Sequence, residues 1–216
     1  MITNRNCIVR LSRYKKALYR FKAMGFVKFF SDTLGEAVGV APSQVRKDFS
    51  LFGISGNRRG GYNLDQLIKK LQNILGKDQI QKVVVVGMGN IGKALISYRG
   101  FEKEGIQIVS VFDIDPAKFE KDQTVPVLPL NEFKSFVQDN NILIGIIAVP
   151  DIAAQQVLDM MSASGVRGVL NFAPIRLKSD KDTVISNVNF ELELENLIYF
   201  VNAAEKQELI NEDKIA

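Results

Sequence analysis

The chain contains a single cysteine, Cys7, and no histidine among its 216 residues. One cysteine cannot form a disulfide or a cysteine-ligated metal site within one chain, which is typical of proteins in a reducing compartment. Histidine is the commonest general acid–base group and the commonest metal ligand, so its absence disfavours most hydrolase and dehydrogenase mechanisms. We therefore expect no catalytic residues and no metal site.

Long hydrophobic runs are also lacking. Basic residues are scattered through residues 1–30 without the apolar segment of a signal peptide. The longest apolar stretch, residues 142–149, is too short to span a bilayer. These features predict a soluble, cytoplasmic protein that does not interact with a membrane.

Acidic residues are scarce in the first part of the chain. Residues 1–79 contain 15 Lys and Arg against 5 Asp and Glu, a net charge of +10, whereas residues 80–216 contain 13 against 19, a net charge of −6. This asymmetry indicates that the first region meets a polyanion and the second does not. The alternative is a random scatter of basic surface residues.

Apolar residues recur at helical spacing in the basic region and predict a helix followed by a helix-turn-helix. The first helix ends at Gly25, and its buried positions are Leu11, Tyr14, Leu18 and Phe21. A short helix capped by Ser31 or Asp32 ends at Gly39, and a further helix spans residues 42–49 with its proline in the first turn.

A glycine-rich basic stretch, residues 53–62, follows this helix and predicts a hairpin or wing. Asn63 and Gln66 then form a variant of the capping box at the start of a helix that Gly76 closes. We therefore predict a winged helix-turn-helix DNA-binding domain over residues 1–79.

The helix over residues 42–49 turns Val45 and Phe49 toward the core and leaves polar and basic side chains outside. Such side chains can bond base edges and flanking phosphates, and a basic wing suits phosphate or the minor groove. The residues predicted to contact double-stranded DNA are Ser43, Gln44, Arg46, Lys47, Arg58 and Arg59. The alternative is a basic helix that faces only solvent.

From residue 82 the pattern changes to alternating strands and helices. Strands are predicted over residues 83–86, 106–112, 142–149 and 166–170, with helical stretches near residues 130–137 and 153–161. The alternation predicts a doubly wound parallel sheet, and hence a Rossmann domain over residues 80–189. The fold class is therefore α/β, with a winged helix-turn-helix domain before the Rossmann domain.

A glycine-rich turn follows the first of these strands and opens a helix, with residues Gly87, Met88, Gly89, Asn90, Ile91 and Gly92. Its glycines permit a tight turn and a close approach to a pyrophosphate, and Asp113 ends the second strand 21 positions later. Asp113 would bond the adenosine ribose and favour NAD(H) over NADP(H), a preference that Lys118 and Lys121 weaken. Asp115 is interpreted as a turn or cap residue before Pro116. Alternatively, the glycines only turn the chain.

The last segment has apolar residues at helical spacing and predicts a helix over residues 190–211. Two interpretations remain open. The helix covers the edge of the sheet, or it reaches beyond its own domain so that residues 190–216 form a dimerisation arm.

Four motifs together identify a family. They are Gln44–Ser50, Gly87–Gly92, Ser97–Phe101 and Leu170–Pro174, and in this order they resemble the Rex family of redox-sensing repressors over nearly the whole chain. The resemblance implies a homodimer, with C-terminal helices swapped between subunits, on a pseudo-palindromic operator. It further implies release when NADH occupies the Rossmann domains, with NAD⁺ competing more weakly.

The resemblance also assigns roles to residues. It implies that Arg46, Lys47 and Arg58 contact DNA and that Asp113 binds the adenine ribose. It also implies that four residues line the nicotinamide end of the site: Val149, Pro150, Asn171 and Phe172. Tyr98 would belong to the switch between the free and NADH-bound dimers, and Phe190 would enter the partner's pocket.

The sequence departs from the family pattern in the wing and in the switch. The wing reads Arg58-Arg59-Gly60-Gly61-Tyr62, where many members have Arg-Gly-x-Gly-Tyr, so a cation is added and a glycine moved. Asn189 stands where an aspartate is expected, and Lys16 where an arginine is frequent. Because an amide carries no charge, we expect a weaker or differently tuned response to NADH.

Two rival functions stay open. An NAD-dependent oxidoreductase with a basic extension would need a proton donor beside the nicotinamide. A CoA-binding or other nucleotide-binding module would also use a Rossmann domain. The expected function is a transcriptional repressor in which NADH or NAD⁺ acts as the effector by changing the spacing of the two recognition helices.

Overall fold

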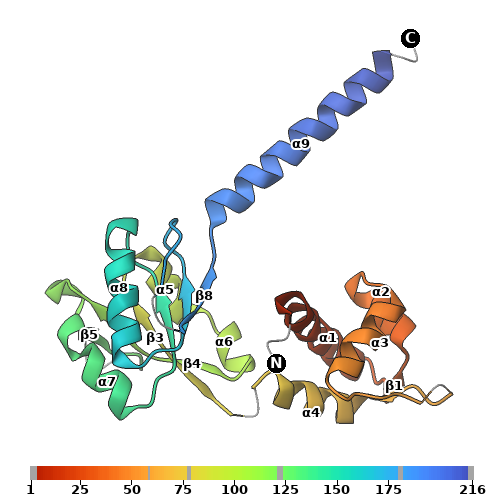
Figure 1. Ribbon diagram of the computed structural model, residues 1–216, viewed down its shortest axis with the longest axis horizontal. Coiled ribbons are helices and arrows are strands. Elements are labelled where there is room, and N and C mark those ends of the chain that lie inside the picture. Colours follow the sequence, from red (N-terminus) through yellow and green to blue (C-terminus); the bar gives the residue numbers. More distant parts are fainter. Residues whose placement is uncertain (1–3, 58, 77–78, 121–123, 180–181, 214–216) are drawn as a thin grey trace. The chain divides into compact units, whose positions relative to one another are not determined.

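The computed structural model describes residues 4–57, 59–76, 79–120, 124–179 and 182–213 (Figure 1). The chain divides into two compact units, Met1–Ile80 and Gln81–Ala216. Each unit has its own hydrophobic core.

The first unit is built from helices with a short antiparallel sheet. Its elements are α1 (Arg5–Ala23), β1 (Lys28–Phe29), α2 (Ser31–Val38), α3 (Pro42–Leu51), β2 (Tyr62–Asn63) and α4 (Leu64–Ile74). Helix α1 packs against α2 and α4, and α2 packs against α3. The core between them contains Leu11, Tyr14, Leu18, Leu34, Phe49 and Leu71. The predicted helix-turn-helix is confirmed.

The ends of these helices follow the predicted signals with one exception. Asn63 caps α4 by accepting a hydrogen bond from the Gln66 N–H at 3.0 Å, and Gly76 follows with a φ of 64°. The predicted cap of α2 is wrong, because Phe30 occupies the cap position and makes no side-chain cap bond. Ser31 is instead the first residue of α2, where its hydroxyl accepts a hydrogen bond from Arg46 at 2.8 Å.

The stretch between α3 and α4 forms the predicted hairpin. Asn57 and Gly61 exchange two backbone hydrogen bonds, of 3.0 and 2.8 Å, and the Asn57 side chain accepts bonds from the backbone of Arg59 and Gly60. Gly61 has a φ of 66°, and a Cβ there would overlap the carbonyl oxygen of Phe29. The glycine that this wing requires is therefore Gly61. Arg58 lies outside the described residues.

The second unit contains a parallel sheet of six described strands in the order β5-β4-β3-β6-β7-β8. The strands are β3 (Gln81–Val86), β4 (Ile106–Asp113), β5 (Val127–Pro129), β6 (Ile144–Ile147), β7 (Gly168–Asn171) and β8 (Val184–Asn187). The helical elements are α5 (Asn90–Ser97), α6 (Gly100–Lys103), η1 (Pro116–Lys118), η2 (Leu130–Glu132), α7 (Phe133–Asp139), α8 (Asp151–Ser164) and α9 (Phe190–Asp213).

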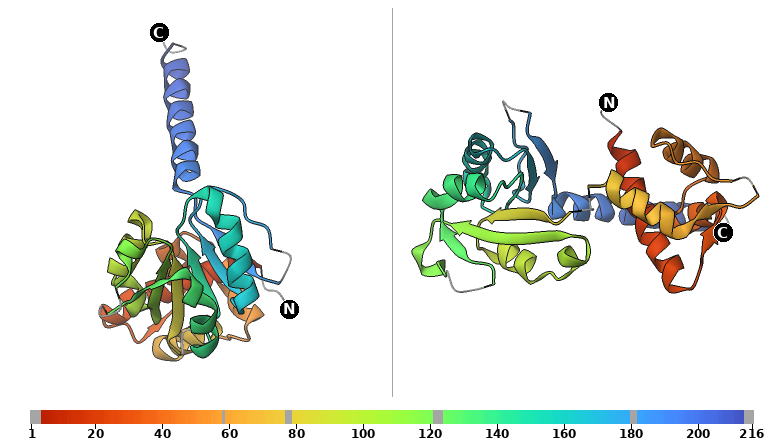
Figure 2. Two further views of the ribbon diagram at one scale, coloured as in Figure 1. Left: turned by 90° about the vertical axis from the view of Figure 1, so that its left-hand side faces the viewer. Right: turned by 90° about the horizontal axis from the view of Figure 1, so that it is seen from below.

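Helices cover both faces of this sheet (Figure 2). On one face, residues of α7 and α8 such as Phe133 and Leu158 pack against Val84 of β3. On the other, Leu95 of α5 and Phe101 of α6 pack in a separate cluster with the neighbouring strand residues. This is the doubly wound arrangement that the sequence predicts, although β6 is shorter than the predicted strand.

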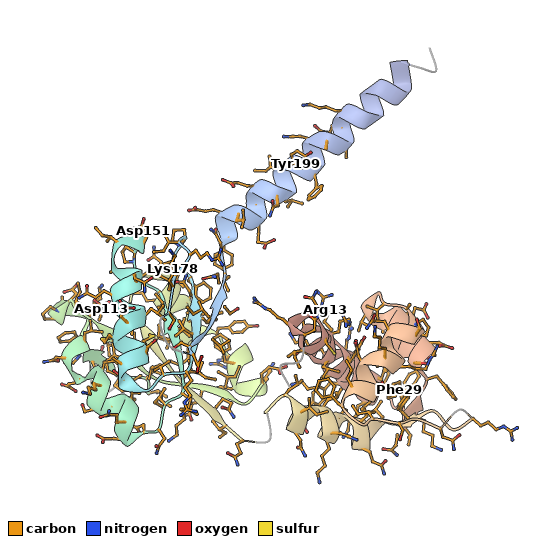
Figure 3. All side chains as sticks on the ribbon, in the orientation of Figure 1. Arg13, Phe29, Asp113, Asp151, Lys178 and Tyr199 are labelled. Atoms are coloured by element: carbon orange, nitrogen blue, oxygen red, sulfur yellow. The ribbon has the colours of Figure 1, made fainter. Side chains whose placement is uncertain are left out.

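The last helix does not cover the sheet. All of its residues from 190 to 206 are exposed, among them Tyr199, which Figure 3 labels. The interpretation that α9 shields the sheet edge is therefore wrong, because the apolar side chains that follow Phe190 in the described part of α9 are exposed. In the described parts of the chain, no helix is both long enough and apolar enough to cross a bilayer.

Candidate functional site

The glycine-rich turn lies between the end of β3 and the start of α5. Gly87 has a φ of 105°, and a Cβ there would overlap the carbonyl oxygen of Ala148 on the neighbouring strand end. A Cβ at Gly92 would overlap the carbonyl oxygen of Gly87. A Cβ at Gly89 would meet open space, so this glycine leaves room beside the helix start. Two glycines thus close the turn, and the third keeps it accessible to a ligand.

A cavity of about 620 Å³ opens beside this turn, at the carboxyl ends of β3, β4 and β6. The chain order of the strands reverses between β3 and β6, and parallel sheets bind ligands at such a reversal. The lining consists of Val86, Gly87, Gly89, Phe112, Asp113, Ile114, Lys118, Leu130, Ala148, Val149, Pro150, Ala153, Gln156, Val157 and Met160. The cavity is therefore mainly apolar, with its charged groups gathered at the end of β4.

Asp113 ends β4 at this cavity, and Figure 3 labels its side chain. Its carboxylate accepts hydrogen bonds from the N–H groups of Met88 at 2.7 Å and Asp115 at 2.9 Å. The Lys118 ammonium lies 3.1 and 3.3 Å from its two oxygens. Burial alone would raise the pKa of Asp113, but these hydrogen bonds outweigh burial and hold that pKa below its usual value. The carboxylate is charged at neutral pH and ties the glycine turn to β4.

Asp115 has the role that its sequence context predicts. Its side chain caps the short helix η1 by accepting a hydrogen bond from the Ala117 N–H at 3.0 Å. This turn brings Lys118 back toward Asp113, and the Lys118 ammonium also lies 3.8 Å from the Asp115 carboxylate. Asp115 therefore belongs to the cluster of charged groups with Asp113 and Lys118, although it does not line the cavity.

The remaining predicted cofactor residues divide into two groups. Val149 and Pro150 line the cavity after β6, but Asn171, Phe172 and Phe190 do not. The Asn171 side chain is fully buried, and its amide nitrogen lies 3.0–3.1 Å from oxygens of Ala173, Ile175 and Asn187.

Asn171 thus holds the segment that follows β7. Next to it, the rings of Phe172 and Phe190 lie 5.9 Å apart, so the start of α9 stands beside the end of β7. Met88, Asn90, Ile91 and Gly92 form the turn and helix start without lining the cavity.

The predicted switch residues lie at the ends of helices or on an exposed helix face. Tyr98 follows α5 and is 60% exposed, with its ring 5.0 Å from that of Phe101. The Asn189 side chain accepts a hydrogen bond from the Leu192 N–H at 3.0 Å and so caps α9. Lys16 is exposed on α1.

Helix α3 carries four of the six predicted DNA-contacting residues, and Arg59 lies in the wing. Ser43, Arg46 and Lys47 are exposed, whereas Gln44 is half-buried and its amide donates a hydrogen bond to Asp48 at 2.7 Å. The Arg46 guanidinium bonds Ser31 of α2, and it lies 3.8 Å from the Asp32 carboxylate. Two of the residues predicted to contact DNA, Gln44 and Arg46, are therefore held in place by neighbouring side chains.

A buried carboxylate that the sequence reasoning missed joins α3 to α1. Asp48 is 1% exposed and receives two hydrogen bonds from the Arg10 guanidinium, at 2.6 and 2.8 Å. Tyr14 donates to it at 2.9 Å, and the Cys7 thiol lies 3.4 Å away. The only available signal was an acidic residue beside Phe49 on the buried side of a basic helix.

These bonds determine the charge state of the cluster. Burial would raise the pKa of Asp48, but hydrogen bonds from Arg10, Tyr14 and Gln44 dominate and lower it. Burial and the neighbouring carboxylate raise the pKa of the Cys7 thiol. Cys7 is therefore a protonated donor at neutral pH, not a thiolate.

The described residues contain no group of three or more acidic or cysteine side chains that is placed to hold a metal ion. Among the described residues, the charged groups that line the cavity are Asp113 and Lys118, and the Asp115 carboxylate lies 3.8 Å from the Lys118 ammonium outside that lining.

Comparison with family models matches each unit separately. The model described as a putative DNA-binding protein N-terminus matches residues 5–50. The model described as a CoA binding domain matches residues 78–175, which contain the glycine turn and most of the sheet. The two matches correspond to the helical unit and the Rossmann-like unit.

Curated relatives match both units together. The redox-sensing transcriptional repressor Rex of Desulforamulus reducens is 43% identical over 200 residues, which is 92% of this chain and 95% of the relative. The protein of the same name from Desulfitobacterium hafniense is 40% identical over 195 residues, 90% and 93% of the two chains.

Solved structures of a Rex-family repressor also match both units together. The structure of RSP, a Rex-family repressor, in complex with β-NAD⁺ and operator DNA aligns with a TM-score of 0.90 at 32% identity and covers 98% of both chains. RSP in complex with β-NADH aligns with a TM-score of 0.84 over 97% of this chain and 99% of the other.

Proposed function

Since the chain belongs to the Rex family of redox-sensing transcriptional repressors, we propose that it binds a pseudo-palindromic operator as a homodimer and leaves it when NADH binds. NAD⁺ competes with NADH for the same site and favours the DNA-bound state. The observation that carries the proposal is the joint presence of a basic helix-turn-helix and an apolar cavity at a glycine turn in one chain.

The dinucleotide lies along the carboxyl edge of the sheet. Asp113 bonds the adenosine ribose, and the pyrophosphate lies over the turn formed by Gly87, Met88, Gly89, Asn90, Ile91 and Gly92. The nicotinamide lies toward Val149, Pro150, Asn171 and Phe172, and Phe190 of the partner subunit enters this pocket and forms one of its walls. A neutral reduced ring enters such an apolar site more readily than a cationic one, which favours NADH over NAD⁺.

DNA is bound by α3 and the wing. Ser43, Gln44 and Lys47 face base edges in the major groove, while Arg46, Arg58 and Arg59 meet phosphates or the minor groove. The hydrogen bond from Gln44 to Asp48 supports a limited role for Gln44, since its amide already has a partner.

Dinucleotide binding and DNA binding are linked through the dimer. Residues 190–216, which include α9, mediate dimerisation, and this accounts for the exposed apolar side chains of α9. NADH changes the mutual orientation of the Rossmann domains through Tyr98, Asn189 and Lys16. The spacing of the two recognition helices then no longer fits the two half-sites.

The protein acts in the cytoplasm, is not an enzyme and requires no metal. The relatives that match both units are named as repressors, which supports the absence of catalysis. The basic first unit, with its net charge of +10, supports a nucleic acid as the partner.

The test is fluorescence anisotropy on a labelled palindromic operator at fixed salt, with a scrambled duplex of equal length as the control. We expect tight binding that is reversed by NADH and not by NAD⁺ or CoA. Binding that ignores NADH would contradict the redox-sensing role. Release by CoA, or turnover of NADH with a substrate, would instead favour the rival functions.

A further inference from the structure

The segment that follows β7, residues 172–178, forms neither helix nor strand and begins at the strand end where we place the nicotinamide. Among the described residues, no backbone-to-backbone hydrogen bond joins residues 173–178 to another part of the chain. The Leu177 side chain is nevertheless only 5% exposed and packs in the same core cluster as Leu158 of α8. Side-chain contacts therefore determine where this segment lies.

Asn171 bonds the first half of the segment. Its side-chain oxygen accepts a hydrogen bond from the Ala173 N–H at 3.0 Å. Its amide nitrogen donates to the carbonyl oxygens of Ala173 and Ile175, at 3.1 and 3.0 Å. These bonds reach no further than Ile175, so another group must hold the end of the segment.

Gln155 of α8 bonds that end through both parts of its side-chain amide. The amide nitrogen donates to the Lys178 carbonyl oxygen at 2.8 Å, and the amide oxygen accepts a hydrogen bond from the Lys178 N–H at 3.1 Å. The same nitrogen also donates to the Asp159 carboxylate, one turn further along α8, at 2.9 Å. An amide has two N–H donors, so both are used, and the bond to Asp159 fixes the orientation of the group.

Helix α8 also borders the cavity, and it does so with different residues. Those that line the cavity are Ala153, Gln156, Val157 and Met160. Gln155 does not line it and faces the segment instead. One helix thus contacts both the cavity and residues 172–178, and a rigid helix of this kind fixes the position of one relative to the other.

We propose that Gln155 is a positioning residue for the nicotinamide end of the site, which keeps residues 172–178 in place against α8. The inference rests on the proposed function, because it takes the cavity as a dinucleotide site with the nicotinamide toward Phe172. Gln155 itself does not touch the dinucleotide. Its loss should therefore weaken contacts to the nicotinamide half and spare the adenosine half, which lies at Asp113 and the glycine turn.

The experiment compares the binding of NADH with that of ADP, which has the adenosine and pyrophosphate of NADH but no nicotinamide. Isothermal titration calorimetry of the full chain measures both affinities. Gln155→Met keeps the length of the side chain but loses both bonds to Lys178. NADH binding should weaken by about tenfold and ADP binding by less than about threefold. Operator affinity without a dinucleotide should not change.

Two further variants sharpen the comparison. Gln155→Glu keeps an acceptor for the Lys178 N–H but loses both donors and sets a carboxylate against that of Asp159, so NADH binding should weaken by at least about tenfold. Asp159→Ala is the matched control. It removes the side-chain partner of Gln155 and leaves the two bonds to Lys178, so it should change neither affinity by more than about threefold.

The outcomes separate this inference from the proposed function. Equal weakening of NADH and ADP in Gln155→Met would mean that Gln155 only stabilises the fold, and unchanged NADH binding would mean that the segment keeps its place without these bonds. Either result would overturn the inference while the proposed function stands. If Gln155→Met does not fold, the same comparison in Gln155→Glu decides. Failure of the unaltered chain to bind NADH would overturn both.

Discussion

Each unit contains a buried carboxylate that accepts several hydrogen bonds, Asp48 in the first unit and Asp113 in the second. The two carboxylates differ in what lies beside them. Asp48 is 1% exposed and is enclosed between α1 and α3, where four side chains point at it. Asp113 is 7% exposed and borders a cavity of about 620 Å³. The same chemical group therefore fixes a helix pair in one unit and presents an acceptor to a ligand in the other.

Removing the charge of Asp48 should produce the largest effect on stability. Asp48→Asn leaves the Arg10 guanidinium without its ionic partner, and breaking a buried ion pair in this way costs about 3–5 kcal/mol. The free energy of unfolding from urea titrations measures the loss. Asp65→Asn, which removes the exposed ion pair with Lys22, is the control and should cost less than about 1 kcal/mol. Similar losses in the two variants would mean that Asp48 does not hold α1 to α3.

Distorting the glycine turn should act on the other unit alone. In Gly92→Ala the added Cβ meets the carbonyl oxygen of Gly87, so the turn must move and NADH binding should weaken by roughly a hundredfold. DNA binding in the absence of NADH should be unchanged. Gly168→Ala on β7 is the control, because a Cβ there makes only ordinary contacts of 3.7 and 3.9 Å. NADH binding by Gly92→Ala at full strength would exclude this turn as the phosphate site.

Lowering the pH should weaken the first unit through Asp48. Because the folded pKa of this carboxyl is lowered, its contribution to stability is complete above the unfolded pKa, about 3.9, and is lost as the pH falls through the folded value. The free energy of unfolding should therefore fall below about pH 4, and this fall should be shallower in Asp48→Asn. Parallel curves for the two proteins would assign the acid sensitivity to other carboxyls.

Restoring the family's carboxylate at the start of α9 should give the smallest effect. Asn189→Asp keeps a side-chain acceptor for the Leu192 N–H and adds a negative charge near the start of α9, so the helix itself should be preserved. We expect half-release from the operator at an NADH concentration lower by about threefold. Asn189→Ser keeps a cap without the charge and is the matched control. Equal NADH-induced release by Asn189→Asp and the unaltered chain would refute a charge-dependent switch.

The parts predicted from sequence are those whose signals are local. The glycine turn and the Asn63 cap each depend on residues close together in the chain, and the structure has them as predicted. Asp113 ends β4 as predicted, whereas its role at the adenosine ribose stays a prediction. The Asp48 cluster was missed because its partners lie 34–41 positions away, except Gln44. Ser31 was mistaken for a cap because nothing in its neighbourhood indicates the bond from Arg46.

Other features depend on tertiary context that spacing does not contain. The position of Asn171 at the nicotinamide end stays a prediction, and what the sequence did not indicate is the set of hydrogen bonds from its side chain to the backbone of the following segment. The exposed apolar face of α9 has the periodicity of a covered helix, but periodicity alone does not say which chain covers it. Sequence spacing predicts which residues share a helix or strand, but it does not predict which atoms their side chains bond.

The central claim is that occupation of the cavity controls DNA binding by the other unit. The most direct test is NADH titration of the labelled operator complex of the unaltered chain and of Gly92→Ala, at the same salt concentration. We expect equal operator affinity of the two proteins without NADH, release of the unaltered chain by NADH, and retention of the variant at the same NADH concentrations. Release of both proteins at the same NADH concentration, or of neither, would contradict it.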